Sequence, residues 1–243
     1  TIRLSFLIFF SCFSNAKCFK NMNDALLNKT FRSVRWTAMN TTYQVGVQIL
    51  TLIILGRLLD PNAFGLMAMV MVVVEFVNVY ARMGIGEAII YKQDVTRNEL
   101  SSLFFFNIVA GLFIYILVSL SSNFISRIYN EPEIIPIMKI ISSLFLISSL
   151  GIVFEAMLLK NLLHNILAKI TIFSSIVSFI LTVVLAYWGK GVYALVFRQV
   201  CLQFIKAASL FLFAAKNNWL PFFHFRFKEI KFYLKFGIYH ALA

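Results

Sequence analysis

The side chains in this sequence that could do chemistry are charged and amide groups set inside apolar runs. Arg198 and Lys206, with Gln199 and Gln203 between them, lie in the apolar stretch from about residue 192 to 215. Arg binds phosphate oxygens through paired N–H groups, and Lys binds them as a point charge. These four residues are therefore candidates for binding an anionic substrate inside a membrane.

A second interpretation of the two bases stays open. A charged side chain near the middle of a bilayer costs about 3 kcal/mol or more unless it has a partner or a ligand. Arg198 and Lys206 could avoid this cost by reaching the membrane interface, or by pairing with Glu75 or Glu155. The sequence does not separate a substrate contact from a structural pair.

Glu75 is the carboxyl group of most interest. Together with Asn78 and Arg82 it lies at helical spacing on one face of the apolar run from about residue 63 to 84. A membrane-embedded carboxyl can take up and release protons, as ion-coupled export requires. Glu75 is therefore an ion-coupling candidate, and the alternative is a structural partner for Arg82 or for a base on another helix.

A row of amides marks the first apolar run, about residues 36–59. Asn40, Gln44 and Gln48 recur there at intervals of four. This row is too polar for helix packing alone, so we expect it to face a cavity. Small residues on other runs, such as Gly111 and Ser178, let helices approach closely and are expected to serve packing.

The composition is that of a polytopic membrane protein. Hydrophobic residues make up 60% and charged residues 13% of the sequence, and the mean hydropathy is +0.85, whereas soluble proteins are about half apolar and about a quarter charged. The net charge of +12 comes from short basic clusters between apolar runs, which are typical of membrane loops and not of a nucleic-acid-binding domain. The three cysteines lack metal-ligand spacing, so we expect no metal, no cofactor and no nucleic-acid partner.

The elements that must position these groups are expected to be helices. The fold class is all-α, and membrane-spanning helices are expected at about 36–59, 63–84, 101–125, 134–159, 170–188 and 192–215. Residues 87–100 are expected to form a polar loop, and 216–235 a basic amphipathic segment on an anionic membrane surface. We interpret residues 1–21 as an upstream translation artefact, with a targeting leader as the alternative, and 236–243 as the start of a seventh helix.

The Lys and Arg residues of the loops set the expected orientation. Most of them fall on the side of the N-terminus, and only Arg57, Arg127 and Lys190 fall on the other. Positively charged loops stay in the cytoplasm. We therefore expect a cytoplasmic N-terminus, with the loops at Asp60, Glu131 and Lys190 facing out.

Four stretches, by their order and spacing, resemble a known family. They are GRLLDPNAFGLMAM (56–69), MGIGEAIIYKQDVT (83–96), the YNEPEI turn (129–134) and WGKGVYALVFRQV (188–200). Over residues 22–243 they resemble the polysaccharide and O-antigen flippases of the multidrug/oligosaccharidyl-lipid/polysaccharide (MOP) exporter superfamily. The resemblance implies the six-helix N-terminal lobe of a two-lobed transporter plus the start of a seventh helix. This sequence departs from the family in supplying one lobe only, and in having Arg82 where the family often has an acid.

The same resemblance implies a function. It is the export, by flipping, of a lipid-linked oligosaccharide, an O-antigen or exopolysaccharide repeat unit, across the bacterial inner membrane. The implied partners are a polyprenyl-pyrophosphate-linked oligosaccharide, membrane lipids, and the missing C-terminal lobe or a second chain. The pyrophosphate would need a cationic, water-filled lane, and the family often has a base near the position of Lys206.

Other functions stay open beside this one. A MATE-like drug or cation antiporter lobe would have acidic cavity residues, whereas here the bases outnumber Glu75 and Glu155. A membrane-embedded polysaccharide polymerase or glycosyltransferase needs catalytic residues on a sizeable loop outside the membrane, and the expected outward loops are short. The sequence has neither a nucleotide-binding glycine loop nor a nucleophile and base pair, so we expect that the chain is not an enzyme. A membrane scaffold without transport activity is the remaining alternative.

Overall fold

The computed structural model describes residues 24–81, 85–92 and 95–217, and beyond them Trp219, Pro221, Phe222, Phe225, Arg226, Ile230, Lys231 and Tyr233. Three features of the sequence analysis lie outside the described residues: the leader at 1–21, Arg82, and the start of a seventh helix at 236–243. Within the described ranges, all regular structure is helical.

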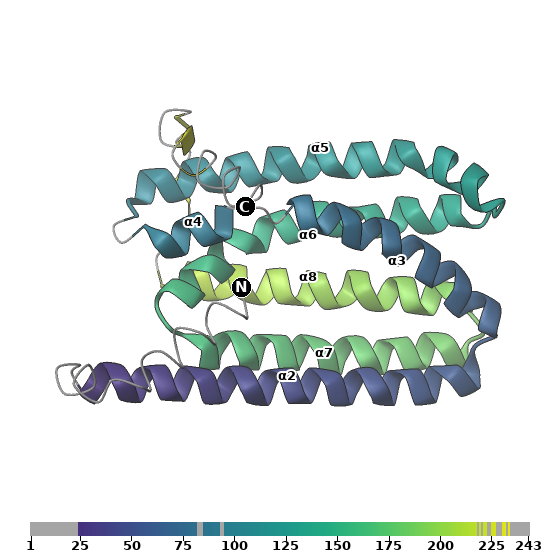
Figure 1. Cartoon of the computed structure of the whole chain (residues 1–243), viewed down its shortest axis with the longest axis horizontal. Helices are drawn as coiled ribbons and strands as arrows, with labels where there is room; N and C mark the ends of the chain where they lie inside the picture. Colours follow the sequence, from purple (N-terminus) through teal and green to yellow (C-terminus); the bar gives the residue numbers. More distant parts are fainter. Residues whose placement is uncertain are drawn as a thin grey trace, which may run out of the picture.

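The described part of the chain contains seven helices, which run along a common direction (Figure 1). They are α2 (Asp24–Leu58), α3 (Pro61–Ala81), α4 (Ile85–Tyr91), α5 (Arg97–Tyr129), α6 (Ile134–Lys160), α7 (His164–Tyr187) and α8 (Val192–Lys216). Six of them contain stretches long and apolar enough to cross a membrane, and α4 is too short to do so. The expected all-α polytopic membrane fold is confirmed.

The long helices pack as a row with two helices laid against it. Helices α5, α6, α8 and α7 lie side by side in that order, α2 packs on α7, and α3 packs on α6 and α8 (Figure 1). Because α2 and α3 cover different helices of the row, α8 lies beneath the space between them.

Short turns at one end of the bundle make consecutive long helices antiparallel. Pro61 begins α3, where its fixed φ suits a helix and its missing N–H has no partner to lose. Asn130 ends α5 in the left-handed conformation, with φ of 54°, which Asn tolerates. Gly189 and Gly191, with φ of 71° and 55°, form the turn between α7 and α8, where a side chain would strain the backbone.

The prediction of a polar loop at residues 87–100 is wrong. Helix α4 occupies its first part, because Ala88 and Ile89 are fully buried there and α4 packs on α6. Helix α5 begins early because a capping box starts it. The Glu99 N–H donates to Thr96 Oγ1 at 3.4 Å, and the Thr96 N–H donates to Glu99 Oε2 at 3.3 Å.

Two other helices also begin earlier than expected. Helix α2 starts at Asp24 instead of about residue 36, since no Pro or Gly interrupts residues 24–45. Helix α7 starts at His164 instead of about residue 170. Polar and basic residues at the membrane interface can therefore extend a helix beyond its apolar run.

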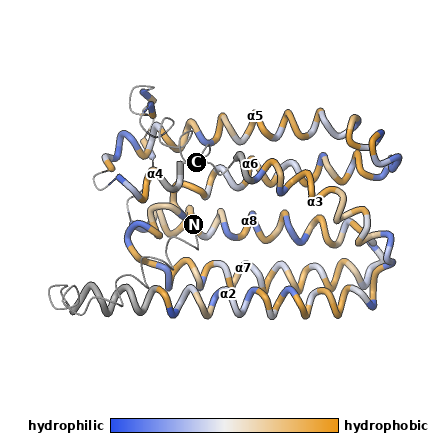
Figure 2. The backbone as a smooth tube through the Cα atoms, viewed as in Figure 1, coloured by the Kyte–Doolittle hydropathy of each residue, from blue (hydrophilic) through white to orange (hydrophobic). Residues whose placement is uncertain are grey.

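Two apolar clusters hold the bundle together, and polar groups lie between them. Along α8 the first cluster ends at Val196 and the second begins at Leu210, and along α6 they meet between Phe145 and Val153. Figure 2 shows hydrophobic residues along most of each helix and hydrophilic residues at the turns. Gln199 and Gln203 fall between the clusters, in the middle of the bundle, where transporters commonly bind their substrates.

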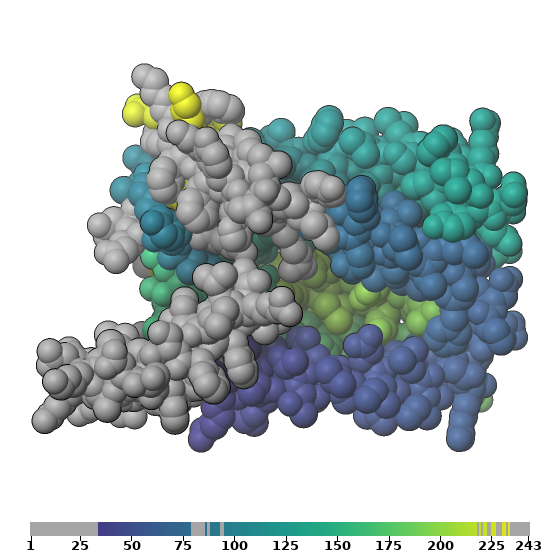
Figure 3. Space-filling model, in the orientation of Figure 1, coloured from purple at the N-terminus to yellow at the C-terminus, as the bar shows by residue number. Residues whose placement is uncertain are grey.

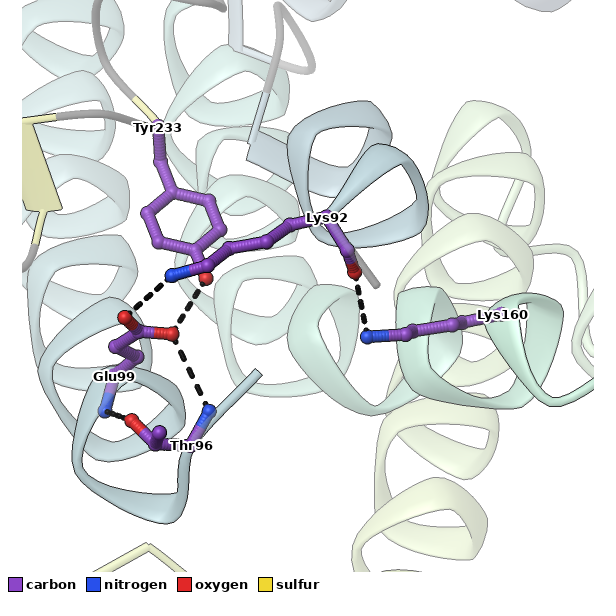
Figure 4. A network of polar contacts seen from close by, with 5 residues as sticks. All are labelled: Lys92, Thr96, Glu99, Lys160 and Tyr233. Atoms are coloured by element: carbon purple, nitrogen blue, oxygen red, sulfur yellow. Dashed lines mark hydrogen bonds and ion pairs between the residues drawn. The ribbon is translucent and has the colours of Figure 1, made fainter. Parts of the chain in front are cut away.

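At the other end of the bundle, Glu99 connects three parts of the chain (Figure 4). Its carboxylate accepts hydrogen bonds from Lys92 Nζ at 2.5 Å and from the Tyr233 hydroxyl at 3.0 Å. Lys160 Nζ donates to the Lys92 carbonyl at 2.7 Å. These contacts join the end of α4, the start of α5 and the end of α6 to the segment after α8.

The segment after α8 is also held by its backbone. The N–H groups of Phe222 and Arg226 donate to the Ser101 and Ser102 hydroxyls at 2.9 and 3.2 Å. Ile230 and Tyr233 are fully buried, while Phe222 and Phe225 are exposed. The described residues of the basic amphipathic segment thus anchor it to α5 and leave aromatic rings exposed.

Candidate functional site

A polar hollow lies between α2, α7 and α8, and we call it the main hollow. It has a cavity volume of about 340 Å³, and Figure 3 shows the surface hollowed between α2 and α3, with α8 behind them. Its lining includes six of the candidates from the sequence: Gln44, Gln48, Arg198, Gln199, Gln203 and Lys206. The structure therefore brings together residues from two helices that are far apart in the sequence.

Two further hollows adjoin the main hollow at α8. The side hollow, with a cavity volume of about 170 Å³, lies between α3, α6 and α8, and its lining includes Glu75 and Asn78. The inner hollow, with a cavity volume of about 50 Å³, lies between α3, α5, α6 and α8, and its lining includes Asn107 and Glu155. Gln203 lines all three hollows, so it lies where they meet.

Lys206 is paired with a carboxylate from the neighbouring helix. Its Nζ lies 2.8 Å from Oε1 and 2.9 Å from Oε2 of Glu155, and the two side chains are 14% and 27% exposed. Lys206 lines the main hollow and Glu155 lines the inner hollow. The pair therefore lies between the two hollows. Of the two carboxylates considered from the sequence, Glu155 and not Glu75 is the partner of Lys206.

Arg198 is not paired in this way. Its Nε is buried without a hydrogen-bond partner in the described part of the chain, and the ion pairs found there do not include it. The main hollow has no carboxylate among its described lining residues. An unpaired buried donor next to a roomy polar space favours the binding of an anion there.

The remaining candidates from the sequence lie elsewhere. Glu75 is an exposed side chain of the side hollow, and it makes no ion pair with the residues that the structure describes. Arg82, its proposed neighbour, lies outside those residues. Asn40 is half-buried, lines none of the three hollows, and has a buried Oδ1 without a partner in the described ranges.

Three of the charged or amide residues that line the hollows were not among the candidate site residues: Asn78, Asn107 and Glu155. Spacing placed Asn78 on the helical face of Glu75, but it was not taken as a site residue. The pairing of Glu155 with Lys206 joins residues 51 positions apart, and no local pattern predicts such a contact.

Small residues serve packing, as their spacing indicates, but some also line the hollows. A Cβ on Gly111 would lie 2.7 Å from the Ser149 Cβ, so α5 and α6 approach closely there. Thr171 and Ser175 of α7 line the main hollow. The Thr171 hydroxyl donates to the Leu167 carbonyl of its own helix at 2.8 Å, which satisfies it within α7.

The fold and these hollows identify the class of protein: it is a polytopic α-helical membrane protein with polar hollows in the middle of its helix bundle. A family model described as "Polysaccharide biosynthesis protein" matches residues 54–243. The chain belongs to this family of polysaccharide biosynthesis proteins, and the predicted resemblance to polysaccharide flippases is confirmed.

Individual relatives agree with this family. The chain is 30% identical over 215 residues to the teichuronic acid biosynthesis protein TuaB of Bacillus subtilis (strain 168), which covers 88% of this chain and 44% of TuaB. It is 25% identical over 213 residues to the lipopolysaccharide biosynthesis protein WzxC of Escherichia coli (strain K12), covering 88% and 43%. It is 23% identical over 199 residues to the succinoglycan biosynthesis transport protein ExoT of Rhizobium meliloti (strain 1021), covering 82% and 40%.

The chain spans less than half the length of each of these relatives. No solved structure matches it significantly. The relatives are named for polysaccharide biosynthesis, and one of them for transport. This chain is accordingly a multi-pass membrane protein of a polysaccharide biosynthesis and export family.

Proposed function

We propose that this chain is one lobe of a flippase, and not an enzyme, that moves a lipid-linked oligosaccharide across the bacterial inner membrane. The observation that carries the proposal is the main hollow, which combines Arg198 and Lys206 with amide side chains and has no carboxylate among its described lining residues. Membership of a polysaccharide biosynthesis family supports a glycan substrate. The name of ExoT supports transport.

The chemistry of the hollow suits such a substrate. A polyprenyl-pyrophosphate-linked oligosaccharide carries an anionic diphosphate between a lipid tail and a sugar chain. Arg198 can bind phosphate oxygens through two N–H groups, and the Gln44, Gln48 and Gln199 amides can both donate to and accept from sugar hydroxyls. The lipid tail would stay in the membrane, against the exposed apolar side chains of the helices.

The proposed arrangement needs a partner and an orientation. The chain spans less than half of its relatives, so a C-terminal lobe or a second chain would close the main hollow from the side of α2 and α3. The N-terminus would be cytoplasmic. Glu75, in the side hollow next to Gln199 and Gln203, would be the group that couples export to an ion.

Reconstitution into liposomes tests the proposal. The chain, alone and together with the remaining part of WzxC, is reconstituted with a fluorescent polyprenyl-pyrophosphate oligosaccharide, and the fraction reached by an external quencher is followed over time. We expect faster equilibration than in protein-free liposomes, a loss of this gain in Arg198→Glu, and no loss in Lys139→Gln, which changes an exposed base outside the hollows.

The same liposomes distinguish the alternative transporter. Equal equilibration rates with and without protein, in both preparations, would contradict the proposal. Movement of the cationic dye ethidium in place of the glycolipid would support a cation antiporter, whose cavity would have to use Glu75.

A further inference from the structure

We propose that Glu155 is an exchangeable counter-ion, which holds Lys206 while the main hollow is empty and gives it up to the diphosphate of a polyprenyl lipid. The inference rests on the proposed function and gives Glu155, which the sequence analysis considered only as a structural partner, a role in substrate binding. Its starting point is the contact of Lys206 Nζ with both Glu155 oxygens, at 2.8 and 2.9 Å.

The position of the pair favours exchange over a fixed structural role. Lys206 projects from α8 into the same hollow as Arg198, whereas Glu155 on α6 lines the inner hollow. An anion in the main hollow would therefore meet Lys206 from a different hollow than the one that Glu155 lines. An anion bound between Arg198 and Lys206 would take the place of Glu155 without crossing it.

The energetics of a membrane-spanning helix require that Lys206 always has a counter-charge. A buried charge without a counter-charge is strongly destabilising. Exchange of one oxyanion for another keeps the ammonium compensated in both states. Arg198 has no carboxylate partner within the described ranges, so it would attract the anion first and bring it within reach of Lys206.

The inner hollow can accommodate the released carboxylate. Amide groups of Asn78, Asn107 and Gln203 line that hollow beside Glu155. Asn107 uses its Nδ2 to donate to the Leu103 carbonyl at 3.0 Å, and the second proton of that amide remains for another acceptor. Glu155 can therefore exchange its bond to Lys206 for amide N–H donors.

Exchange also provides for release of the substrate. A transport site must bind well enough to load and weakly enough to unload. When the diphosphate leaves, Glu155 returns to Lys206, and this competition lowers the affinity for the substrate. Removal of the Glu155 charge should therefore strengthen binding, which is the opposite of what loss of a purely structural ion pair would do.

Binding of farnesyl diphosphate to the detergent-purified chain tests the inference by titration calorimetry. Farnesol and inorganic pyrophosphate are measured in parallel, to separate lipid-linked diphosphate from lipid alone and from free anion. We expect Glu155→Gln to bind farnesyl diphosphate about tenfold more tightly than the unchanged chain, a difference of about 1.4 kcal/mol. Glu133→Gln removes an exposed carboxylate outside the hollows and should change binding less than about twofold.

A double-mutant cycle shows whether the gain acts through Lys206. In the Lys206→Gln background, Glu155→Gln should have no effect on the affinity. The exchanged pair Glu155→Lys with Lys206→Glu should keep the melting temperature of the unchanged chain but lose farnesyl diphosphate binding, because the cation then lies in the inner hollow.

The outcomes separate the two proposals. A Glu155→Gln affinity equal to or weaker than that of the unchanged chain, or a gain that persists in Lys206→Gln, overturns the counter-ion role while the proposed function stands. Absence of farnesyl diphosphate binding in the unchanged chain and in Glu155→Gln alike overturns the proposed function together with it. Equal affinities for farnesyl diphosphate and inorganic pyrophosphate assign the site to a free anion and also overturn the inference.

Discussion

Arg198 and Lys206 lie two turns apart on the same helix, and their surroundings give them different energetic roles. The Lys206 charge is compensated by Glu155, whereas Arg198 has a buried Nε without a partner in the described part of the chain. An unsatisfied buried donor destabilises the protein without ligand, and a bound ligand that accepts its hydrogen bond offsets this destabilisation. The two bases should therefore respond in opposite directions when each is replaced by methionine.

Arg198→Met is expected to raise the free energy of unfolding by about 1 kcal/mol, because it removes an unpaired donor. Lys206→Met is its matched control and is expected to lower the free energy of unfolding by about 1 to 2 kcal/mol, because it leaves Glu155 without a cation. The loss is smaller than for a fully buried pair since both side chains keep some exposure. Melting temperatures in one detergent check both; destabilisation of Arg198→Met would show that Arg198 has a structural partner.

The residue types of the main hollow could be predicted from the sequence, but their pairing could not. Gln44, Gln48 and Arg198 stand out because polar groups in apolar runs must be paired or wet. Asn40 obeyed the same rule and lies away from the hollows. Whether Lys206 would meet Glu75 or Glu155 depends on how α6 and α8 pack, and spacing within one helix carries no information on that.

At the scale of elements, apolar length predicted the spanning helices and missed the short one. Helix α4 has only 7 residues, too few for a spanning apolar run. The burial of Ala88 and Ile89, among its described side chains, is recognisable only once α6 covers them. The start of α5 could have been predicted from the sequence, because Thr96 followed three residues later by Glu99 is the pattern of a capping box. The signal was missed because the helix boundary was predicted from hydropathy alone, which placed these two residues in a loop.

Gly111 should tolerate no side chain, because α5 and α6 meet there. In Gly111→Ala the new Cβ would lie 2.7 Å from the Ser149 Cβ and 2.9 Å from the Phe145 carbonyl oxygen, so the helices must separate, at a cost of about 1 to 3 kcal/mol. Gly46→Ala on α2 is the control, since nothing lies within 4 Å of its Cβ and Ala favours a helix by about 0.5 to 1 kcal/mol. Thermal unfolding should rank the unchanged chain between the two variants, and equal melting temperatures would contradict the close packing.

Tyr233 should make the attachment of the segment after α8 dependent on pH. Burial, together with the hydrogen bond and the charge of Glu99, raises the pKa of Tyr233 above its ordinary value. The neutral phenol is therefore favoured in the folded state, and its stabilising effect is complete below the ordinary tyrosine pKa of about 10 and is lost as the pH rises above it.

Limited proteolysis at the exposed Lys231 measures that attachment. For the unchanged chain we expect slow cleavage at neutral pH and faster cleavage above about pH 10. Tyr233→Phe removes the hydroxyl, so it should be cleaved faster at neutral pH and lose this part of the pH dependence. The same pH profile in both proteins would exclude Tyr233 as the titrating group.

At the scale of the whole molecule, the two ends of the bundle differ. One end has the short turns at Asp60, Asn130 and Lys190, and the other has α4, Lys160 and the segment that follows α8 (Figure 1). The apolar clusters lie toward these two ends, and the hollows lie between them. A substrate headgroup in the main hollow would therefore lie between the two membrane faces.

The difference between the two ends predicts how the molecule lies in the membrane. Basic residues favour the cytoplasm, and the end with α4 and the basic segment after α8 is the more basic of the two, so the turns at Asp60, Asn130 and Lys190 should face out. Single cysteines at Glu133 and Lys190, in a background without Cys12, Cys18 and Cys201, should react with a membrane-impermeant maleimide on intact cells. A cysteine at the exposed Asn98 should react only after permeabilisation. Labelling of Asn98→Cys alone on intact cells would show that the orientation is the reverse of the predicted one. Labelling at both ends of the bundle would contradict a single orientation, because one end of a helix bundle lies on one side of the membrane.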